Sequence, residues 1–212
     1  MAPLILAGIR LGLGSQVLIP HLDLTIAPGT VATVMGPSGS GKSSLLALVA
    51  GLLPPAFSAA GQVRLGPEDL TPLPAHRRRL GLLYQDDLLF PHLSLADNLA
   101  FGLAPEVRGT ARKRSVEEAL TAAELEGLGG RDPTTLSGGQ RARAALFRTL
   151  LARPRALLLD EPFARLDQDL RGRMRRLVFG QAAARGLPVL LVTHDPADAE
   201  HADGVLIQLP GK

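Results

Sequence analysis

The sequence predicts an α/β fold with a mostly parallel central sheet. The first observation is a series of short, nearly continuous apolar runs, each bounded by turn residues. Such runs are typical of parallel strands that are buried on both faces. The second observation is that segments with helical spacing lie between the runs, and this alternation favours a parallel sheet. The predicted strands are 31–35, 80–84, 156–159, 189–193 and 205–209.

The helical segments indicate how the chain is organised. The clearest are 42–53, 116–125 and 138–152, and Pro154 ends the third. Residues 86–155 are richer in helix signals and loops, so we expect them to form an inserted helical subdomain. Residues 1–85 and 156–212 would form the core, with a small antiparallel β part near the N-terminus. The whole chain, 1–212, would then be a single domain.

Composition excludes several classes of protein. The chain has 212 residues, of which 46% are hydrophobic and 20% charged, which is ordinary globular usage and argues against disorder. It has no cysteine, so it can form neither a disulfide nor a thiolate metal site. The longest apolar stretch, 45–57, is interrupted by prolines and is shorter than the roughly 20 residues of a membrane helix. Any role at a membrane would therefore require a partner.

Two basic runs, 76–79 and 171–176, raise the question of nucleic-acid binding. The simpler interpretation is that they are solvated helix faces interspersed with acids. The chain has one tyrosine, six phenylalanines and no tryptophan, which argues against a platform for stacking single-stranded bases. We therefore expect no nucleic-acid partner.

A phosphate-binding loop follows the first predicted parallel strand. Residues 36–43 match the pattern G-x-x-x-x-G-K-[ST] between a strand and a helix. The glycines let backbone N–H groups face a phosphate, Lys42 supplies a positive charge, and the Ser43 hydroxyl can bind Mg²⁺. A tight turn alone would explain neither of these two side chains. The predicted nucleotide-binding residues are Gly36, Pro37, Ser38, Gly39, Ser40, Gly41, Lys42, Ser43 and Ser44.

Two acids end a later apolar strand. Asp160 is placed to hold Mg²⁺, and Glu161 extends past the strand, where it can accept a proton from an attacking water. Two solvated acids at a strand end are the alternative, but that is a weak explanation behind four apolar residues. Because ligands bind beyond the carboxyl ends of parallel strands, we expect Gly36, Gln85, Glu161 and His194 at one edge of the sheet.

A second phosphate-binding device lies at the start of a helix. Ser137, Gly138, Gly139 and Gln140 follow Leu136, and the two glycines open the helix. Backbone N–H groups and a hydroxyl therefore sit at its positive end. One chain with two such devices suggests that each nucleotide is held from two sides.

With these motifs, the chain resembles the ATPase subunits of ABC transporters over nearly its whole length. Residues 136–140 are identical to the family signature. The resemblance implies that Gln85 is the Q-loop glutamine, which meets Mg²⁺ and the attacking water, that Asp167 is the D-loop aspartate, and that His194 is the switch histidine at the γ-phosphate. It further implies a homodimer in which two ATP molecules are held between the P-loop of one subunit and the signature of the other.

The sequence departs from the family at two positions. Leu13 stands where an adenine-stacking aromatic is usual, and no aromatic residue precedes Phe57. We therefore expect weaker nucleotide affinity and a relaxed choice between ATP and GTP. Ala164 begins the D-loop, residues 164–167, where serine is common, so one hydrogen bond across the dimer would be missing.

Residues 85–98 resemble importer ATPases of the thiamine, polyamine and sulfate type. The resemblance implies an integral membrane permease as partner, a solute-binding protein, and a cytoplasmic place on the inner face of the membrane. Exposed Leu88, Leu89 and Phe90 would contact the permease, although ordinary packing is an alternative. An exporter or lipoprotein-extraction ATPase and a soluble ABC protein remain alternatives, whereas Glu161 disfavours a module that binds ATP without hydrolysing it.

Overall fold

The computed structural model describes residues 1–84, 86–202 and 204–210. The chain is divided into two compact units. The core unit consists of Met1–Leu82, Arg155–Glu161 and Arg173–Lys212, and the helical unit consists of Leu83–Pro154 and Pro162–Gly172.

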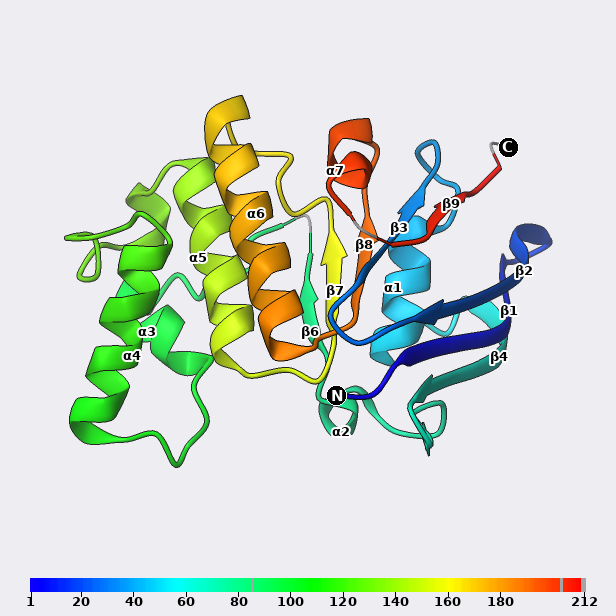
Figure 1. The fold of residues 1–212 in the computed structure, drawn as a ribbon, viewed down its shortest axis with the longest axis horizontal. Helices are drawn as coiled ribbons and strands as arrows, with labels where there is room; N and C mark the ends of the chain where they lie inside the picture. The colour runs from blue at the N-terminus through cyan, green and yellow to red at the C-terminus, as the bar shows by residue number, and fades with distance from the viewer. Residues whose placement is uncertain (85, 203, 211–212) are drawn as a thin grey trace. The chain divides into compact units, whose positions relative to one another are not determined.

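The parallel sheet confirms the predicted α/β fold. Its strands are β3 (Val31–Met35), β6 (Gly81–Leu83), β7 (Leu157–Asp160), β8 (Val189–Val192) and β9 (Leu206–Gln208). They lie in the order β6-β7-β8-β3-β9, and the pairs β7–β8, β8–β3 and β3–β9 are parallel (Figure 1). Every predicted strand is present, each within two residues of its expected limits.

Burial explains why these short runs form strands. All residues of β3, β7 and β8 are buried. Leu190 pairs with Ala32 on one side and Leu158 on the other, so three apolar strands run in register. Burying one such leucine contributes about 1.5–3 kcal/mol. The shared register also fixes where the strands end, and it places their carboxyl ends at one edge.

An antiparallel sheet completes the core unit. Its strands are β1 (Leu4–Leu13), β2 (Gln16–Ile26), β4 (Phe57–Leu65) and β5 (Glu68–Asp69), in the order β2-β1-β4-β5. Helix α1 (Lys42–Ala50) contributes Leu45, Leu46 and Val49 to the same apolar cluster as β1 and β8 (Figure 1). The phosphate-binding loop is thus held at the start of a helix that is packed inside the core.

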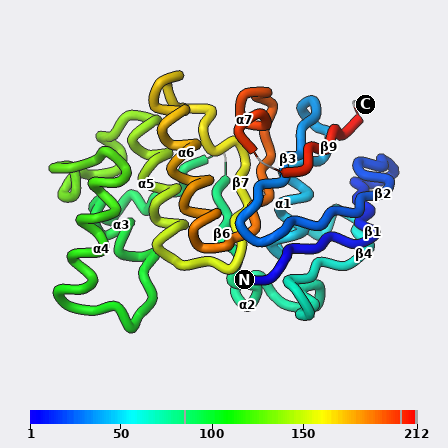
Figure 2. Tube along the Cα trace, in the orientation of Figure 1, coloured from blue at the N-terminus to red at the C-terminus, as the bar shows by residue number. Residues whose placement is uncertain are grey.

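The helical unit is built on three helices. These are α3 (Leu95–Phe101), α4 (Gly109–Ala122) and α5 (Gly138–Leu151), which pack on one another (Figure 2). The short η1 (Pro133–Thr135) precedes α5, and α6 (Gln168–Arg185) has its first five residues in this unit. The remaining helices, α2 (Ala75–Arg78) and α7 (Pro196–Glu200), belong to the core unit. No helix in the described part of the chain is long and apolar enough to cross a membrane.

The basic runs contain two buried arginines, which corrects their interpretation as solvated faces. Arg78 and Arg175 are each 5% exposed. Arg78 donates from Nη1 to the carbonyls of Leu48 and Val49, and from Nε to that of Leu73. A residue in the 76–79 run therefore satisfies carbonyl groups at the C-terminal end of α1. This position also complements the negative end of the helix dipole.

We expect Arg78→Met to destabilise the core unit by about 3 kcal/mol, because it leaves several buried carbonyl groups without donors. Arg78→Lys should recover only part of this loss, since an ammonium group lacks the guanidinium's planar fork of donors. Urea unfolding followed by circular dichroism measures both. The matched control is Arg77→Met at the exposed neighbouring position, and equal effects at positions 77 and 78 would contradict the assignment.

Candidate functional site

The phosphate-binding loop joins β3 to α1, as predicted. Gly41 has a φ of 96°, which side chains disfavour, and a Cβ there would lie 3.1 Å from the Cβ of Leu18. A Cβ at Gly36 would lie 2.8 Å from the Ser40 hydroxyl. The loop therefore folds so tightly that only glycine fits at these two positions, and a loop of this kind can turn backbone N–H groups toward a phosphate.

Lys42 is held inside the curve of this loop. Its side chain is buried, and Nζ donates to the carbonyl oxygens of Gly36 at 2.7 Å and Pro37 at 2.9 Å. These bonds place the ammonium group at the inner side of the loop, where it can neutralise phosphate oxygens. The residues predicted to bind nucleotide, 36–44, all lie in this loop and the first turn of α1.

Asp160, the last residue of β7, is buried beside the loop. Burial raises the pKa of its carboxyl group above the usual range, and the nearby charge of Glu161 raises it further. A hydrogen bond from Ser43 and the charge of Lys42 act in the opposite direction. The Ser43 hydroxyl and the Asp160 carboxylate are hard oxygen donors on facing segments, and this donor set suits Mg²⁺.

Glu161 and His194 meet beyond the ends of two neighbouring strands. Glu161 has a φ of 47°, a region that costs non-glycine residues on the order of 1–3 kcal/mol and that often occurs at functional positions. Its Oε1 lies 2.8 Å from Nδ1 of His194, and the carboxylate is 17% exposed while the imidazole is 66% exposed. A carboxylate that is partly shielded and an accessible imidazole thus form a hydrogen-bonded pair at the edge of the sheet.

A buried ion pair fixes the backbone beside His194. Arg175 on α6 donates from Nε to Asp198 on α7 at 2.9 Å, and Thr193 donates to the other oxygen of the same carboxylate at 2.8 Å. The Thr193 hydroxyl also accepts from Asp195 N–H. The turn that carries His194 is therefore anchored on both sides. We did not predict this anchor, because no spacing in the sequence links Arg175 to α7.

The second device lies in the helical unit, where Ser137 caps α5. Its hydroxyl accepts from Gln140 N–H at 3.2 Å, and the Gln140 side chain accepts from Ser137 N–H at 2.8 Å. This reciprocal capping box explains Ser137 and Gln140 structurally. Gly138 and Gly139 follow in the first turn, where their N–H groups lie at the positive end of the helix dipole.

The predicted residues therefore fall into two groups. The core unit brings together the phosphate-binding loop, Asp160, Glu161 and His194. The helical unit holds Ser137–Gln140 and Asp167, whose carboxylate accepts from Leu170 N–H at the start of α6. Gln85 lies outside the described residues.

Comparison with known proteins identifies the family. The sequence profile of the ABC transporter family matches residues 19–164. The chain is 44% identical over 198 residues to an ABC transporter ATP-binding protein of Escherichia coli (strain K12), covering 93% of this chain and 91% of that protein. This chain belongs to the ABC transporter family. It is an ATP-binding subunit of that family, and it hydrolyses ATP.

Two further relatives are named as importer subunits. A thiamine import ATP-binding protein of Cereibacter sphaeroides is 48% identical, covering 84% of this chain and 76% of that protein. A sulfate/thiosulfate import ATP-binding protein of Caulobacter vibrioides is 46% identical, covering 90% of this chain but only 57% of that protein. The chain thus spans little more than half the length of the sulfate relative.

Solved structures show the same fold. The dimeric structure of a bacterial ABC transporter cassette matches with a TM-score of 0.83 at 29% identity, covering 98% of this chain and 94% of that one. The same cassette in a post-hydrolysis state bound to ADP and Pi matches with a TM-score of 0.84 at 28% identity, covering 97% and 94%. The family and the fold are therefore established together.

The raised pKa of Asp160 predicts a pH-dependent stability. The folded chain holds this proton more tightly than the unfolded chain, so the stability that it contributes is present at low pH and is lost as pH rises through the folded pKa. Asp160→Asn should therefore raise the melting temperature of the nucleotide-free chain at pH 7. The gain should shrink toward about pH 4, where an ordinary aspartate is protonated.

Thermal denaturation between pH 4 and pH 8 measures this effect. Glu106→Gln, at an exposed position, serves as the control and should change little. An Asp160→Asn melting temperature below that of the wild type at pH 7, or a gain that grows on acidification, would contradict the interpretation.

Proposed function

We propose that this chain powers a bacterial importer of a small solute, and that both units act as one ATPase domain. The predicted division into a core (1–85 and 156–212) and a helical subdomain (86–155) is part of this proposal. The observation that carries the ATPase part of the proposal is the Glu161–His194 pair beyond β7 and β8. These two strands lie in the same sheet as β3, the strand before the phosphate-binding loop. Relatives named as thiamine and sulfate import proteins favour import.

Each site residue has a role in this proposal. Residues 36–44 bind the phosphates of ATP, and Lys42 neutralises the β and γ oxygens. Ser43, Asp160 and Gln85 would hold Mg²⁺, which supplies charge neutralisation on the phosphates when it is bound. Glu161 takes a proton from the attacking water, and His194 donates a hydrogen bond to the γ-phosphate.

The second phosphate-binding device requires a second subunit. We infer a homodimer in which Ser137, Gly138, Gly139 and Gln140 of one subunit close over the ATP bound to the other, with Asp167 at the interface. The dimeric cassette of similar fold supports this arrangement. The chain would lie at the inner face of the membrane on an integral permease, and a solute-binding protein would deliver the solute.

Purification of the tagged chain from native membranes tests the importer proposal. We expect a permease with several membrane spans, together with a solute-binding protein. A permease with an exported or extracted lipid-linked substrate would favour the exporter alternative. Recovery of soluble partners alone would overturn the transport function and leave the ATPase activity standing.

Glu161→Gln should reduce ATP hydrolysis by roughly 10²–10⁴-fold, because the amide cannot accept a proton from water. ATP should then accumulate in a stable dimer. Light scattering detects the dimer, and phosphate release measures the rate. The control is Glu118→Gln on α4, an exposed residue, which should hydrolyse ATP at the wild-type rate. A Glu161→Gln variant that keeps full activity would remove Glu161 from its proposed role.

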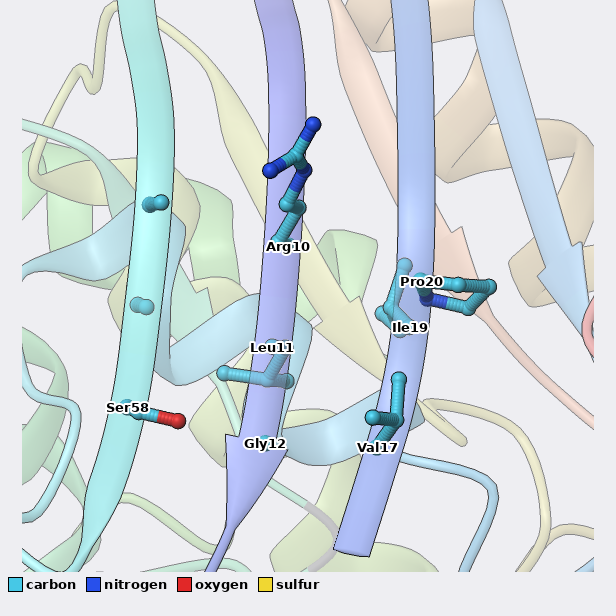
Figure 3. Close-up of a pocket in the computed structure, with 9 residues that line it drawn as sticks. Arg10, Leu11, Gly12, Val17, Ile19, Pro20 and Ser58 are labelled. Atoms are coloured by element: carbon cyan, nitrogen blue, oxygen red, sulfur yellow. The ribbon is translucent and has the colours of Figure 1, made fainter.

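The base-binding end of the site is expected near the end of β1. Leu13 is 41% exposed, and it pairs with Phe57 on the neighbouring strand β4. A hollow of about 440 Å³ lies over β1, β2 and β4 nearby, and no aromatic residue is among its lining residues (Figure 3). An exposed aliphatic residue offers an adenine less stacking energy than an aromatic ring would.

We expect Leu13→Tyr to tighten ATP binding about tenfold, as a stacking gain of about 1–3 kcal/mol implies. Titration calorimetry with ATP and GTP measures the affinity and the selectivity. Phe57→Leu tests whether the neighbouring ring already supplies the stacking surface. If Leu13→Tyr leaves the dissociation constant unchanged while Phe57→Leu weakens binding, the proposed role of position 13 is wrong.

A further inference from the structure

One buried carboxylate in the helical unit binds two arginines from distant segments. Asp87 is 9% exposed, and its Oδ2 accepts from Arg165 Nη1 at 3.0 Å and from Arg141 Nε at 3.3 Å. Arg165 lies in the D-loop, and Arg141 lies one residue after the signature. A buried charge of this kind is stable only while its partners remain in place.

Each of the two arginines also donates a hydrogen bond from a second nitrogen atom. Arg165 Nη2 donates to Asp86 at 2.8 Å, so one guanidinium binds two successive acids. Arg141 Nη1 donates at 2.6 Å to the carbonyl of Leu136, directly before the capping serine of α5. The carboxylate of Asp87 is thereby connected, through one side chain, to the first residue of the signature.

The D-loop and the signature also touch directly. A Cβ at Gly139 would meet the carbonyl oxygen of Arg165 and the side chain of Leu166, each at 3.5 Å. Asp167, two residues after Arg165, caps the start of α6. The D-loop is therefore fixed at one end by Asp167 and at the other by the Arg165–Asp87 ion pair.

We propose that Arg165 is a positioning residue that ties the D-loop to the signature through Asp87, so that its charge sets the rate of ATP hydrolysis and not the affinity for nucleotide. The inference rests on the proposed homodimer, in which the signature and Asp167 act on a nucleotide bound to the other subunit. No member of the Arg165–Asp87–Arg141 network belongs to the phosphate-binding loop. We therefore expect loss of the ion pair to leave the phosphate-binding loop of the core unit unchanged.

Burial ranks the two acids that Arg165 binds. The Asp86 side chain is 78% exposed, and pairs of this kind contribute little because water screens them. Asp87 is shielded and shared by two cations, so its removal leaves Arg141 and Arg165 without their common partner. We expect the effect of Asp86→Asn to be small and that of Asp87→Asn to be the largest in the network.

The experiment measures steady-state ATP hydrolysis and the dissociation constant for Mg·ADP in the full chain. Arg165→Gln should lower kcat about tenfold, a barrier change of about 1.4 kcal/mol, with an unchanged ADP affinity. Arg165→Lys, which keeps the charge, should recover part of the rate. Arg114→Gln on α4 is the matched control, since it removes an arginine from an exposed ion pair with Glu118.

The double variant Arg165→Gln/Asp87→Asn separates positioning from general damage. If the two residues act as a pair, the losses in kcat combine less than multiplicatively, by about threefold or more. Purely multiplicative losses, an Arg165→Gln rate equal to the wild type, or an equal loss with Arg114→Gln would each overturn the inference. An inactive wild-type chain with a normal ADP affinity would instead count against the proposed function.

Discussion

The site depends on the parallel register of three buried strands. β7, β8 and β3 lie side by side, and each ends at the same edge, so residues that are far apart in the sequence meet there. The strands contribute almost no chemistry themselves, since their residues are buried and, apart from Thr33 and Asp160, apolar. Their function is to fix the backbone from which Gly36, Glu161 and His194 extend. A slip in register would separate Glu161 from His194 without changing either residue.

Several buried charges in the two units act mainly as anchors. Arg78 holds the end of the helix that follows the phosphate-binding loop, and Arg175 holds the turn that carries His194. In the helical unit, Asp87 holds the start of α5 and the D-loop. Arg78 and the two arginines that bind Asp87 each use a guanidinium, whose planar set of donors binds more than one oxygen at once, which an ammonium cannot reproduce. This explains physically why arginine, and not lysine, occupies these positions.

The sequence predicted those parts of the structure that depend on local patterns. Apolar runs bounded by turn residues predicted all five parallel strands, and the glycines of residues 36–41 predicted the phosphate-binding loop. The buried arginines could not be predicted in this way. In a linear sequence, Arg78 and Arg175 look like their exposed neighbours, because burial depends on which carbonyls and carboxylates the fold brings to them. The role of Asp87 likewise depends on two arginines that lie 54 and 78 positions away in the sequence.

The signature illustrates how one motif can serve two physical purposes. Ser137 and Gln140 satisfy each other's backbone groups, so they are needed for α5 to begin at that point whether or not a phosphate is bound. The glycines between them carry no side chain that could cover the N–H groups of the first turn. A helix start that is capped by its own side chains keeps a fixed geometry, and fixed donors stabilise a charged ligand better than donors that must first reorganise. The capping of α5 by these side chains is therefore compatible with the proposed binding role of the motif and supports it.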